Sequence, residues 1–150
     1  MKRGKALIYL VAIASFFTSH AQEFITKCDV QIVRRTEQQL NNLTLDSAMK
    51  FFMTFGEECS NNAEFSEYWD EVMFEILDKH PEIYLQCMCE LTDKKYRNAI
   101  LEEIESPVND GINNRGIREH LNDFEILQEK CQGKVLRETI HALDMAVNKK

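Results

Sequence analysis

The chain has 150 residues, 44% of them hydrophobic, and carries 25 acidic against 18 basic residues, a formal net charge of −7. This length and apolar content are typical of a single domain with one core. An acidic surface repels nucleic-acid phosphates and anionic lipid headgroups, so the composition argues against nucleic acid as a partner. A basic protein suits it better, although negative charge also serves simply to keep a protein in solution.

Residues 1–21 have the three parts of a secretory signal peptide. Lys2, Arg3 and Lys5 precede an apolar run over residues 6–17, and Ser19-His20-Ala21 forms a small-residue cleavage site. A run of about a dozen residues is shorter than the roughly 20 that a membrane-spanning helix needs. We expect cleavage after Ala21 and a secreted or periplasmic product without a membrane anchor. It would be a single all-helical domain, residues 22–150, with a formal charge of −10 from 15 basic and 25 acidic residues.

Helices are expected to dominate this product, because two prolines and five glycines are few and no segment alternates like a β-strand. The first helix is predicted over about residues 24–40. A second is predicted over 44–57 with Thr44 as its N-cap, and it is apolar around most of its circumference, which indicates an interior position.

The clearest helical pattern covers residues 63–79, where apolar residues recur at the spacing of one helix face. The opposite side is acidic, and we call it the acidic face: Glu64, Glu67, Asp70, Glu71, Glu75 and Asp78. Phe74 lies in the middle of the acidic face.

Proline at position 81 ends the third helix and starts a fourth, over residues 81–91, since proline suits a first helical turn. Thr92 is predicted to cap a fifth helix over 93–105. Residues 108–116 then read as a loop rich in asparagine and glycine.

After this loop, the apolar residues form two stripes at helical spacing, one before and one after Gln132-Gly133. The second stripe is rotated around the helix axis by more than a quarter turn from the first. We therefore predict a break or kink near Gly133. The result is an all-α fold of about seven helices in antiparallel hairpins. It forms either a short HEAT-like superhelical stack or a closed helical bundle. The fourth helix, like the second, is apolar all round, and helices covered by neighbours on two sides favour the stack.

Five cysteines remain after signal cleavage, and some should pair in an oxidising compartment. Cys28 and Cys59 lie at similar distances on either side of the turn between the first two helices, so we predict a disulfide between them. The odd total leaves at least one cysteine unpaired. The pairing of Cys87, Cys89 and Cys131 stays open.

The pair Cys87 and Cys89 invites a metal or redox interpretation, because two nearby thiolates can bind a soft ion. Residues two apart on a helix, however, point about 200° away from each other. Core packing is therefore favoured over a metal site. The chain contains no Gly-x-Ser-x-Gly, Ser-x-x-Lys or phosphate-binding glycine motif, so we expect no catalytic activity and no cofactor.

The acidic face suggests a partner-binding surface, in which an aromatic anchor is surrounded by a charged rim. The candidate residues are Phe74, Glu67, Asp70, Glu71, Glu75 and Asp78. The alternative is that a neighbouring helix, such as the first or the last, covers Phe74 as a second packing layer.

Three function classes follow. The leading one is an exported, non-catalytic protein-interaction module, for example an inhibitor or immunity-type protein that binds a basic partner. The second is a carrier of a small apolar ligand in a helical core rich in phenylalanine and methionine: Phe51, Phe52, Met53, Phe55, Met73 and Met88. The third, an enzyme or metal protein that uses Cys87, Cys89 or a histidine, is disfavoured by the helical geometry.

Overall fold

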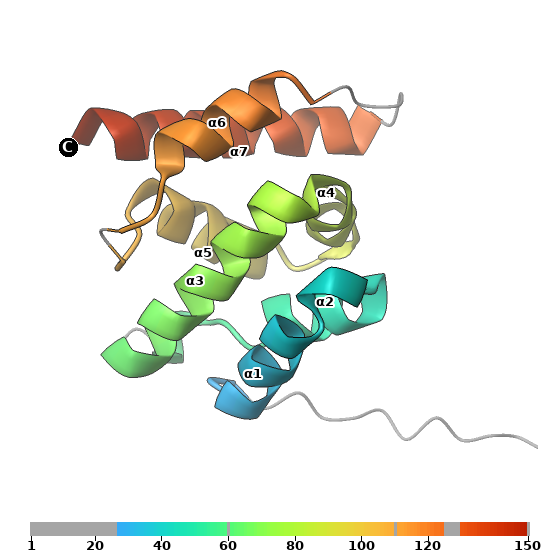
Figure 1. Cartoon of the computed structure of the whole chain (residues 1–150), viewed down its shortest axis with the longest axis vertical. Coiled ribbons are helices and arrows are strands. Elements are labelled where there is room, and N and C mark those ends of the chain that lie inside the picture. Colours follow the sequence, from blue (N-terminus) through green and yellow to red (C-terminus); the bar gives the residue numbers. More distant parts are fainter. Residues whose placement is uncertain (1–26, 60, 110, 125–129, 150) are drawn as a thin grey trace, which may run out of the picture.

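The computed structural model describes residues 27–59, 61–109, 111–124 and 130–149 (Figure 1). These residues form seven α-helices and two 3-10 helices, with no strand among them. The predicted all-helical class is therefore confirmed, with the expected number of helices. The predicted signal peptide, residues 1–21, lies outside the described residues.

The helices follow one another with short connections. They are α1 (Val30–Gln38), α2 (Leu45–Phe52), α3 (Ala63–Lys79), α4 (Pro81–Glu90), α5 (Lys94–Glu105), α6 (Asn114–Asn122) and α7 (Lys130–Lys149). The 3-10 helices Leu40–Asn42 and Glu57–Cys59 lie on either side of α2.

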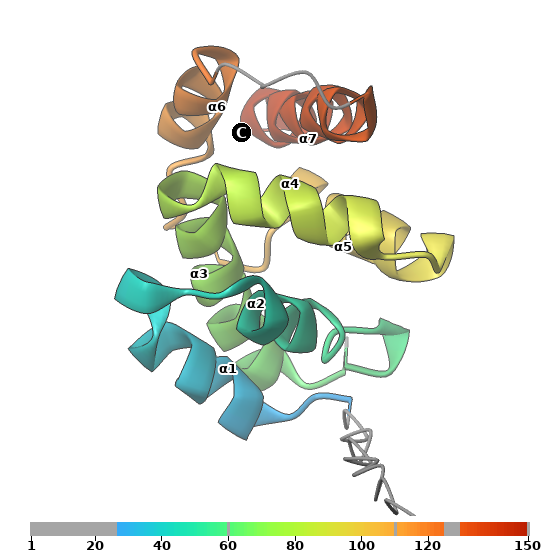
Figure 2. The same cartoon turned by 90° about the vertical axis from the view of Figure 1, so that its right-hand side faces the viewer.

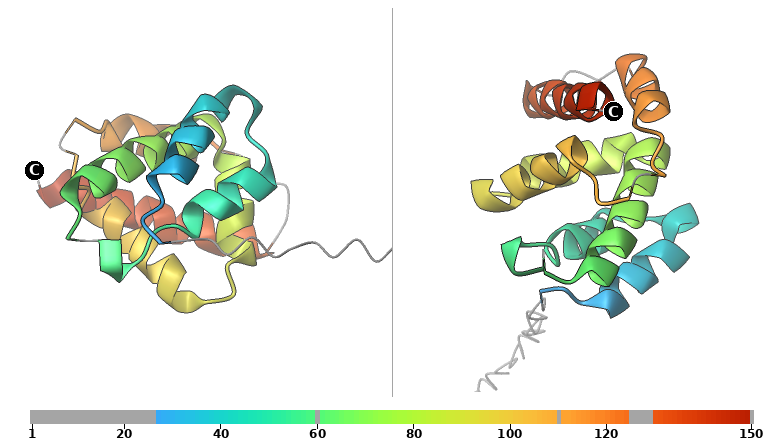
Figure 3. Two further views of the ribbon diagram at one scale, coloured as in Figure 1. Left: turned by 90° about the horizontal axis from the view of Figure 1, so that it is seen from below. Right: turned by 90° about the vertical axis from the view of Figure 1, so that its left-hand side faces the viewer.

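Helix pairs are arranged in three tiers (Figure 2). One tier holds α1 and α2, the next α4 and α5, and the last α6 and α7. Helix α3 runs obliquely beside these pairs, from one tier toward the next. Figure 3 shows the same arrangement from the opposite side and from below. Helix α2 packs on α4, and α7 packs on α4, α5 and α6. This order of tiers along the chain is compatible with the predicted stack.

Side-chain caps determine where two of the helices begin. The Thr44 hydroxyl accepts a hydrogen bond from the Ser47 amide at 3.2 Å, which confirms Thr44 as the N-cap of α2. The prediction that Thr92 caps the fifth helix is wrong by one residue. The Asp93 carboxylate accepts the Lys95 amide hydrogen bond at 2.8 Å, so α5 begins at Lys94.

Helices α1 and α2 are shorter than predicted. The Asp29 carboxylate caps α1 by accepting a hydrogen bond from the Gln31 amide at 2.9 Å, so that the helix begins at Val30. The chain tightens into a 3-10 helix soon after Gln38, and α2 ends at Phe52.

The predicted break near Gly133 is wrong, because α7 is continuous from Lys130 to Lys149. The interruption comes earlier: α6 ends at Asn122. The first apolar stripe thus belongs in part to α6, which buries Ile117 and Leu121. Helix α7 packs on three helices, so apolar residues are buried around a broad part of its circumference. In the sequence, such a broad apolar surface resembles two stripes at different angles.

The core is centred on an aromatic cluster. The Trp69 ring is fully buried and stacks on Phe51 and Phe55, with ring centroids 5.0 Å and 4.2 Å apart. A buried polar contact joins the second and third tiers: the Tyr84 hydroxyl of α4 lies 3.0 Å from the Thr139 hydroxyl of α7. Such pairing satisfies polar groups that would otherwise be costly to bury.

One disulfide closes the first tier, and another joins the second tier to the third. The predicted bond between Cys28 and Cys59 is confirmed, with the Cα atoms 5.5 Å apart. A second bond joins Cys89 of α4 to Cys131 of α7, with the Cα atoms 6.0 Å apart. Cys87 is free and buried, and burial raises the pKa of its thiol to about 12. The neighbouring cysteines point to different sides of α4, as helical geometry predicts.

Candidate partner-binding groove

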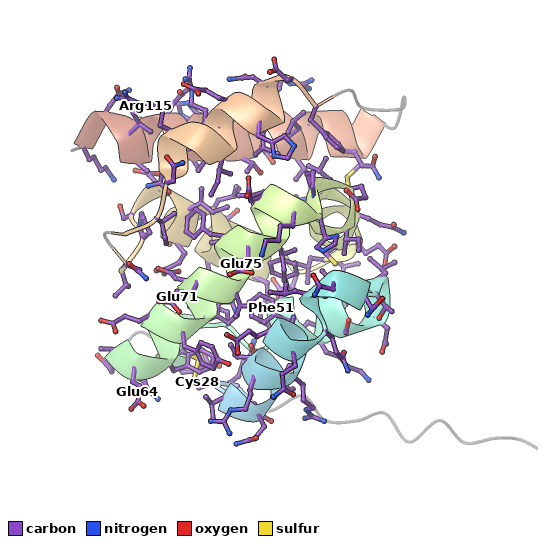
Figure 4. All side chains as sticks on the ribbon, in the orientation of Figure 1. Cys28, Phe51, Glu64, Glu71, Glu75 and Arg115 are labelled. Atoms are coloured by element: carbon purple, nitrogen blue, oxygen red, sulfur yellow. A yellow bond between two sulfur atoms is a disulfide. The ribbon has the colours of Figure 1, made fainter. Side chains whose placement is uncertain are left out.

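Helix α3 presents most of the acidic face to solvent. Figure 4 shows Glu64, Glu71 and Glu75 spaced along the helix. All members of the acidic face except Asp70 are exposed. Glu71, Glu75 and Asp78 follow each other at intervals of four and three residues, which places them in one row about 10 Å long.

Phe74 is not the exposed side chain that the acidic face suggested, because it is only 3% exposed. The alternative, that neighbouring elements cover Phe74 as a second packing layer, is confirmed by this burial, and α6 is one of the elements beside it. Helix α6 packs against α3, and Phe74 lines a hollow together with Ile117 of α6. Phe74 therefore contributes to the floor of this hollow.

The hollow lies between α3, α6 and the loop before α6, and we call it the α3–α6 groove. Its volume is ≈380 Å³. Three apolar side chains contribute to it, namely Phe74, Ile112 and Ile117, and three carboxylates lie along its α3 side, namely Glu71, Glu75 and Asp78. Asn109, Gly111, Asn113 and Gly116 complete its lining.

Each carboxylate of the groove has a partner within the protein. Glu71 accepts a hydrogen bond from the Asn109 carboxamide at 2.9 Å. Glu75 pairs with Lys79 one helical turn later, at 2.7 Å, and Asp78 lies 3.4 Å from the His120 ring nitrogen. Exposed pairs of this kind contribute at most about 1 kcal/mol, so a partner's charge can replace them at little cost.

Asp70 does not belong to the binding surface that the sequence suggested, because its side chain is fully buried. Its carboxylate instead accepts hydrogen bonds from the backbone of the loop that precedes α6. The Val108 amide donates to Asp70 Oδ2 at 2.8 Å, and the Asn109 amide lies 3.4 Å from the same oxygen. Within the loop, the Gly111 amide donates to Asn109 Oδ1 at 2.8 Å. These bonds fix the wall of the groove that faces α3.

A second carboxylate, Glu103 of α5, lies beside Asp70. Asp70 Oδ1 and Glu103 Oε1 are both buried, and neither has a hydrogen-bond partner among the described residues. Burial, and then the charge of Glu103, raises the pKa of Asp70 to about 8; burial also raises the pKa of Glu103. With this pKa Asp70 keeps its proton at neutral pH, and a proton between the two carboxyl groups would satisfy both oxygens. No sequence pattern pointed to Glu103.

The core proposed for an apolar ligand is packed with side chains. Phe51, Phe52, Phe55, Met73 and Met88 are buried, and Met53 is half-buried. The Phe52 ring meets Phe51, Trp69 and Tyr84 edge to face. Such mutual contact favours a filled core over a ligand cavity.

Within the described part of the chain, no group of three or more histidine, cysteine or acidic side chains is placed to hold a metal ion. Cys89, one of the candidate ligands, is in a disulfide. None of the helices in the described ranges is both long and apolar enough to cross a membrane.

The described residues thus define an all-helical, disulfide-linked protein with an acid-rimmed groove on α3. No protein-family model, curated protein or solved structure matches the chain. Its function is therefore inferred from the groove itself.

Proposed function

We propose that this protein is an exported, non-catalytic interaction module that binds a basic protein through the acidic face of α3. An inhibitor or immunity-type protein is an example of this class. The observation that carries the proposal is the α3–α6 groove, which combines an apolar floor with a row of carboxylates.

The groove has the composition of a protein interface. Interfaces bury an apolar or aromatic centre and surround it with polar groups that exclude water, and charge complementarity then selects the partner. Here the half-buried Ile112, together with the largely buried Phe74 and Ile117, forms the apolar centre, and Glu71, Glu75 and Asp78 are the charged edge. The whole chain carries a net negative charge, so it also attracts a basic protein, and repels an acidic one, before the two surfaces touch.

Two further features support export. The signal-like pattern of residues 1–21 is the first. The second is the pair of disulfides, since such bonds persist in secreted and periplasmic proteins and are rare in reducing compartments.

Affinity capture tests the proposal. Immobilised protein and a Glu71→Lys/Glu75→Lys variant are exposed to the exported proteins of the source cells, and the captured proteins are quantified by mass spectrometry. We expect basic proteins to be captured by the unmodified protein and lost with the variant. Glu102→Lys, an exposed change on α5, is the control and should retain them. Capture that is the same for all three proteins, or capture of acidic proteins only, would contradict the proposal.

A further inference from the structure

We infer that the α3–α6 groove binds one long cationic side chain, of lysine or arginine, that projects from the basic partner. This inference rests on the proposed function and specifies what the partner inserts. It follows from the shape of the groove, the signs of its charges and the way its walls are held.

The apolar part of the groove suits a methylene chain. Phe74, Ile112 and Ile117 contribute its apolar lining. Lysine and arginine cover such surface with their methylene stems while the charged end stays among polar groups. The volume of ≈380 Å³ lies at the lower end of the roughly 300–1,000 Å³ of ligand pockets, which is suitable for one side chain with its flanking backbone.

The charged part of the groove selects a cation. None of the ten residues that line it in the described part of the chain is basic, and three of them are carboxylates. An anionic side chain would be repelled by Glu71, Glu75 and Asp78. A purely apolar side chain would take water from these carboxylates without replacing it by a charge, which is unfavourable. A side chain with an apolar stem and a cationic end satisfies both parts.

An ammonium group of the protein already lies beside one carboxylate of this edge. Lys79 Nζ lies 2.7 Å from the Glu75 carboxylate, although both side chains are about half exposed. An incoming ammonium or guanidinium group can exchange with Lys79 at the carboxylate, because exposed pairs of this kind are weak.

The walls of the groove are fixed before a partner arrives. Asp70 holds the backbone at Val108 and Asn109, and Asn109 in turn donates to Glu71. Across the groove, Asn113 caps α6 by accepting a hydrogen bond from the Gly116 amide at 3.1 Å. A preformed site loses little conformational freedom on binding, so even a single side chain can be recognised.

Nuclear magnetic resonance titration with short peptides tests the inference. The ¹⁵N-labelled exported protein is titrated with acetyl-Gly-Gly-Lys-Gly-Gly-amide and with its arginine, norleucine and glutamate counterparts. We expect the lysine or arginine peptide to shift the amide signals of Gly111, Gly116 and Ile117 in a saturable way. The norleucine and glutamate peptides should leave these signals in place.

Paired variants locate the binding. Glu75→Gln/Asp78→Asn removes two charges from the groove and should weaken binding of the cationic peptide about three- to ten-fold. Glu102→Gln/Glu105→Gln removes two charges at the same spacing from α5, away from the groove, and should leave the affinity unchanged. Amide spectra with the dispersion of the unmodified protein show that each variant is folded.

Other outcomes would overturn the inference while leaving the proposed function intact. One is equal binding of the norleucine and lysine peptides. Another is equal weakening by Glu64→Gln/Glu67→Gln, which changes the acidic face outside the groove lining. The absence of any peptide shift, when the capture experiment still finds a basic partner, would also refute it. Failure of capture together with saturable lysine-peptide shifts would instead refute the proposed function and support the cationic site.

Discussion

Replacing Asp70 with asparagine should remove a pH dependence from the stability of this protein. In the wild type, the buried Asp70 accepts a hydrogen bond from the Val108 amide, and its raised pKa keeps it protonated beside Glu103 at neutral pH. An asparagine carboxamide keeps an oxygen for the Val108 amide and offers an N–H group to the Glu103 oxygen. The variant therefore retains the hydrogen bonds but has no proton to lose at position 70.

The direction of the effect follows from the raised pKa of Asp70, from 3.8 to about 8. Above pH 4 the unfolded chain releases the proton while the folded protein keeps it. The contribution of Asp70 to the free energy of unfolding therefore falls as the pH rises from about 4 to about 8. The slope for one proton is about 1.4 kcal/mol per pH unit, or about 3 kcal/mol between pH 5 and pH 7. This is a large part of the roughly 5–15 kcal/mol of a typical domain.

Urea denaturation followed by circular dichroism at pH 5, 6 and 7 measures this effect. Asp70→Asn should be close to the wild type at pH 5 and about 2–3 kcal/mol more stable at pH 7. Glu64→Gln, at an exposed position of the same helix, controls for the loss of a charge and should follow the wild type. Parallel pH profiles for Asp70→Asn and the wild type would refute the protonation of Asp70 at neutral pH.

Three further predictions concern the cysteines and one buried hydroxyl. Replacing Cys28 and Cys59 by serine should lower the free energy of unfolding by about 3–4 kcal/mol, as expected for a loop of about 30 residues, and an unchanged urea midpoint would contradict this. The Cys87 thiol should resist iodoacetamide at pH 8 in the native protein and react in urea, because burial raises its pKa to about 12; mass spectrometry of the alkylated peptides distinguishes these outcomes. Tyr84→Phe should cost about 1 kcal/mol because the buried Thr139 hydroxyl keeps its hydrogen bond to the Val135 carbonyl at 3.0 Å but loses the one with Tyr84, and a stability equal to that of the wild type would show that the Tyr84 bond is not formed.

Local signals predicted the helices well where the chain itself marks their ends. Helix α3 begins and ends as predicted, since the Asn62 side chain caps it, accepting a hydrogen bond from the Phe65 amide at 3.2 Å, and Pro81 begins the next helix. The Cys28–Cys59 bond was predictable because it depends only on the hairpin between α1 and α2. These features need no knowledge of distant parts of the chain.

The groove was less predictable, because it depends on which helices cover α3. Periodicity gives the angular position of Phe74 and Asp70 on the helix, but only the packing of α6 and the loop before it determines that both are buried. Glu103 lies 33 residues from Asp70 in the sequence, so nothing local links the two carboxylates. The carboxylates Glu71, Glu75 and Asp78 were identified from the sequence, but not the apolar side chains of the opposite wall.

The disulfides divide the backbone into two covalently closed loops. One loop encloses α1 and α2, the other encloses α5 and α6, and α3 lies in the open segment between Cys59 and Cys89. A single peptide-bond cut inside either loop leaves the chain in one covalent piece. A cut in the open segment separates it into two, held together by packing alone. The helix that carries the groove is thus part of the covalent bridge between two independently cross-linked halves, together with most of α4, and a cut anywhere in this bridge separates them.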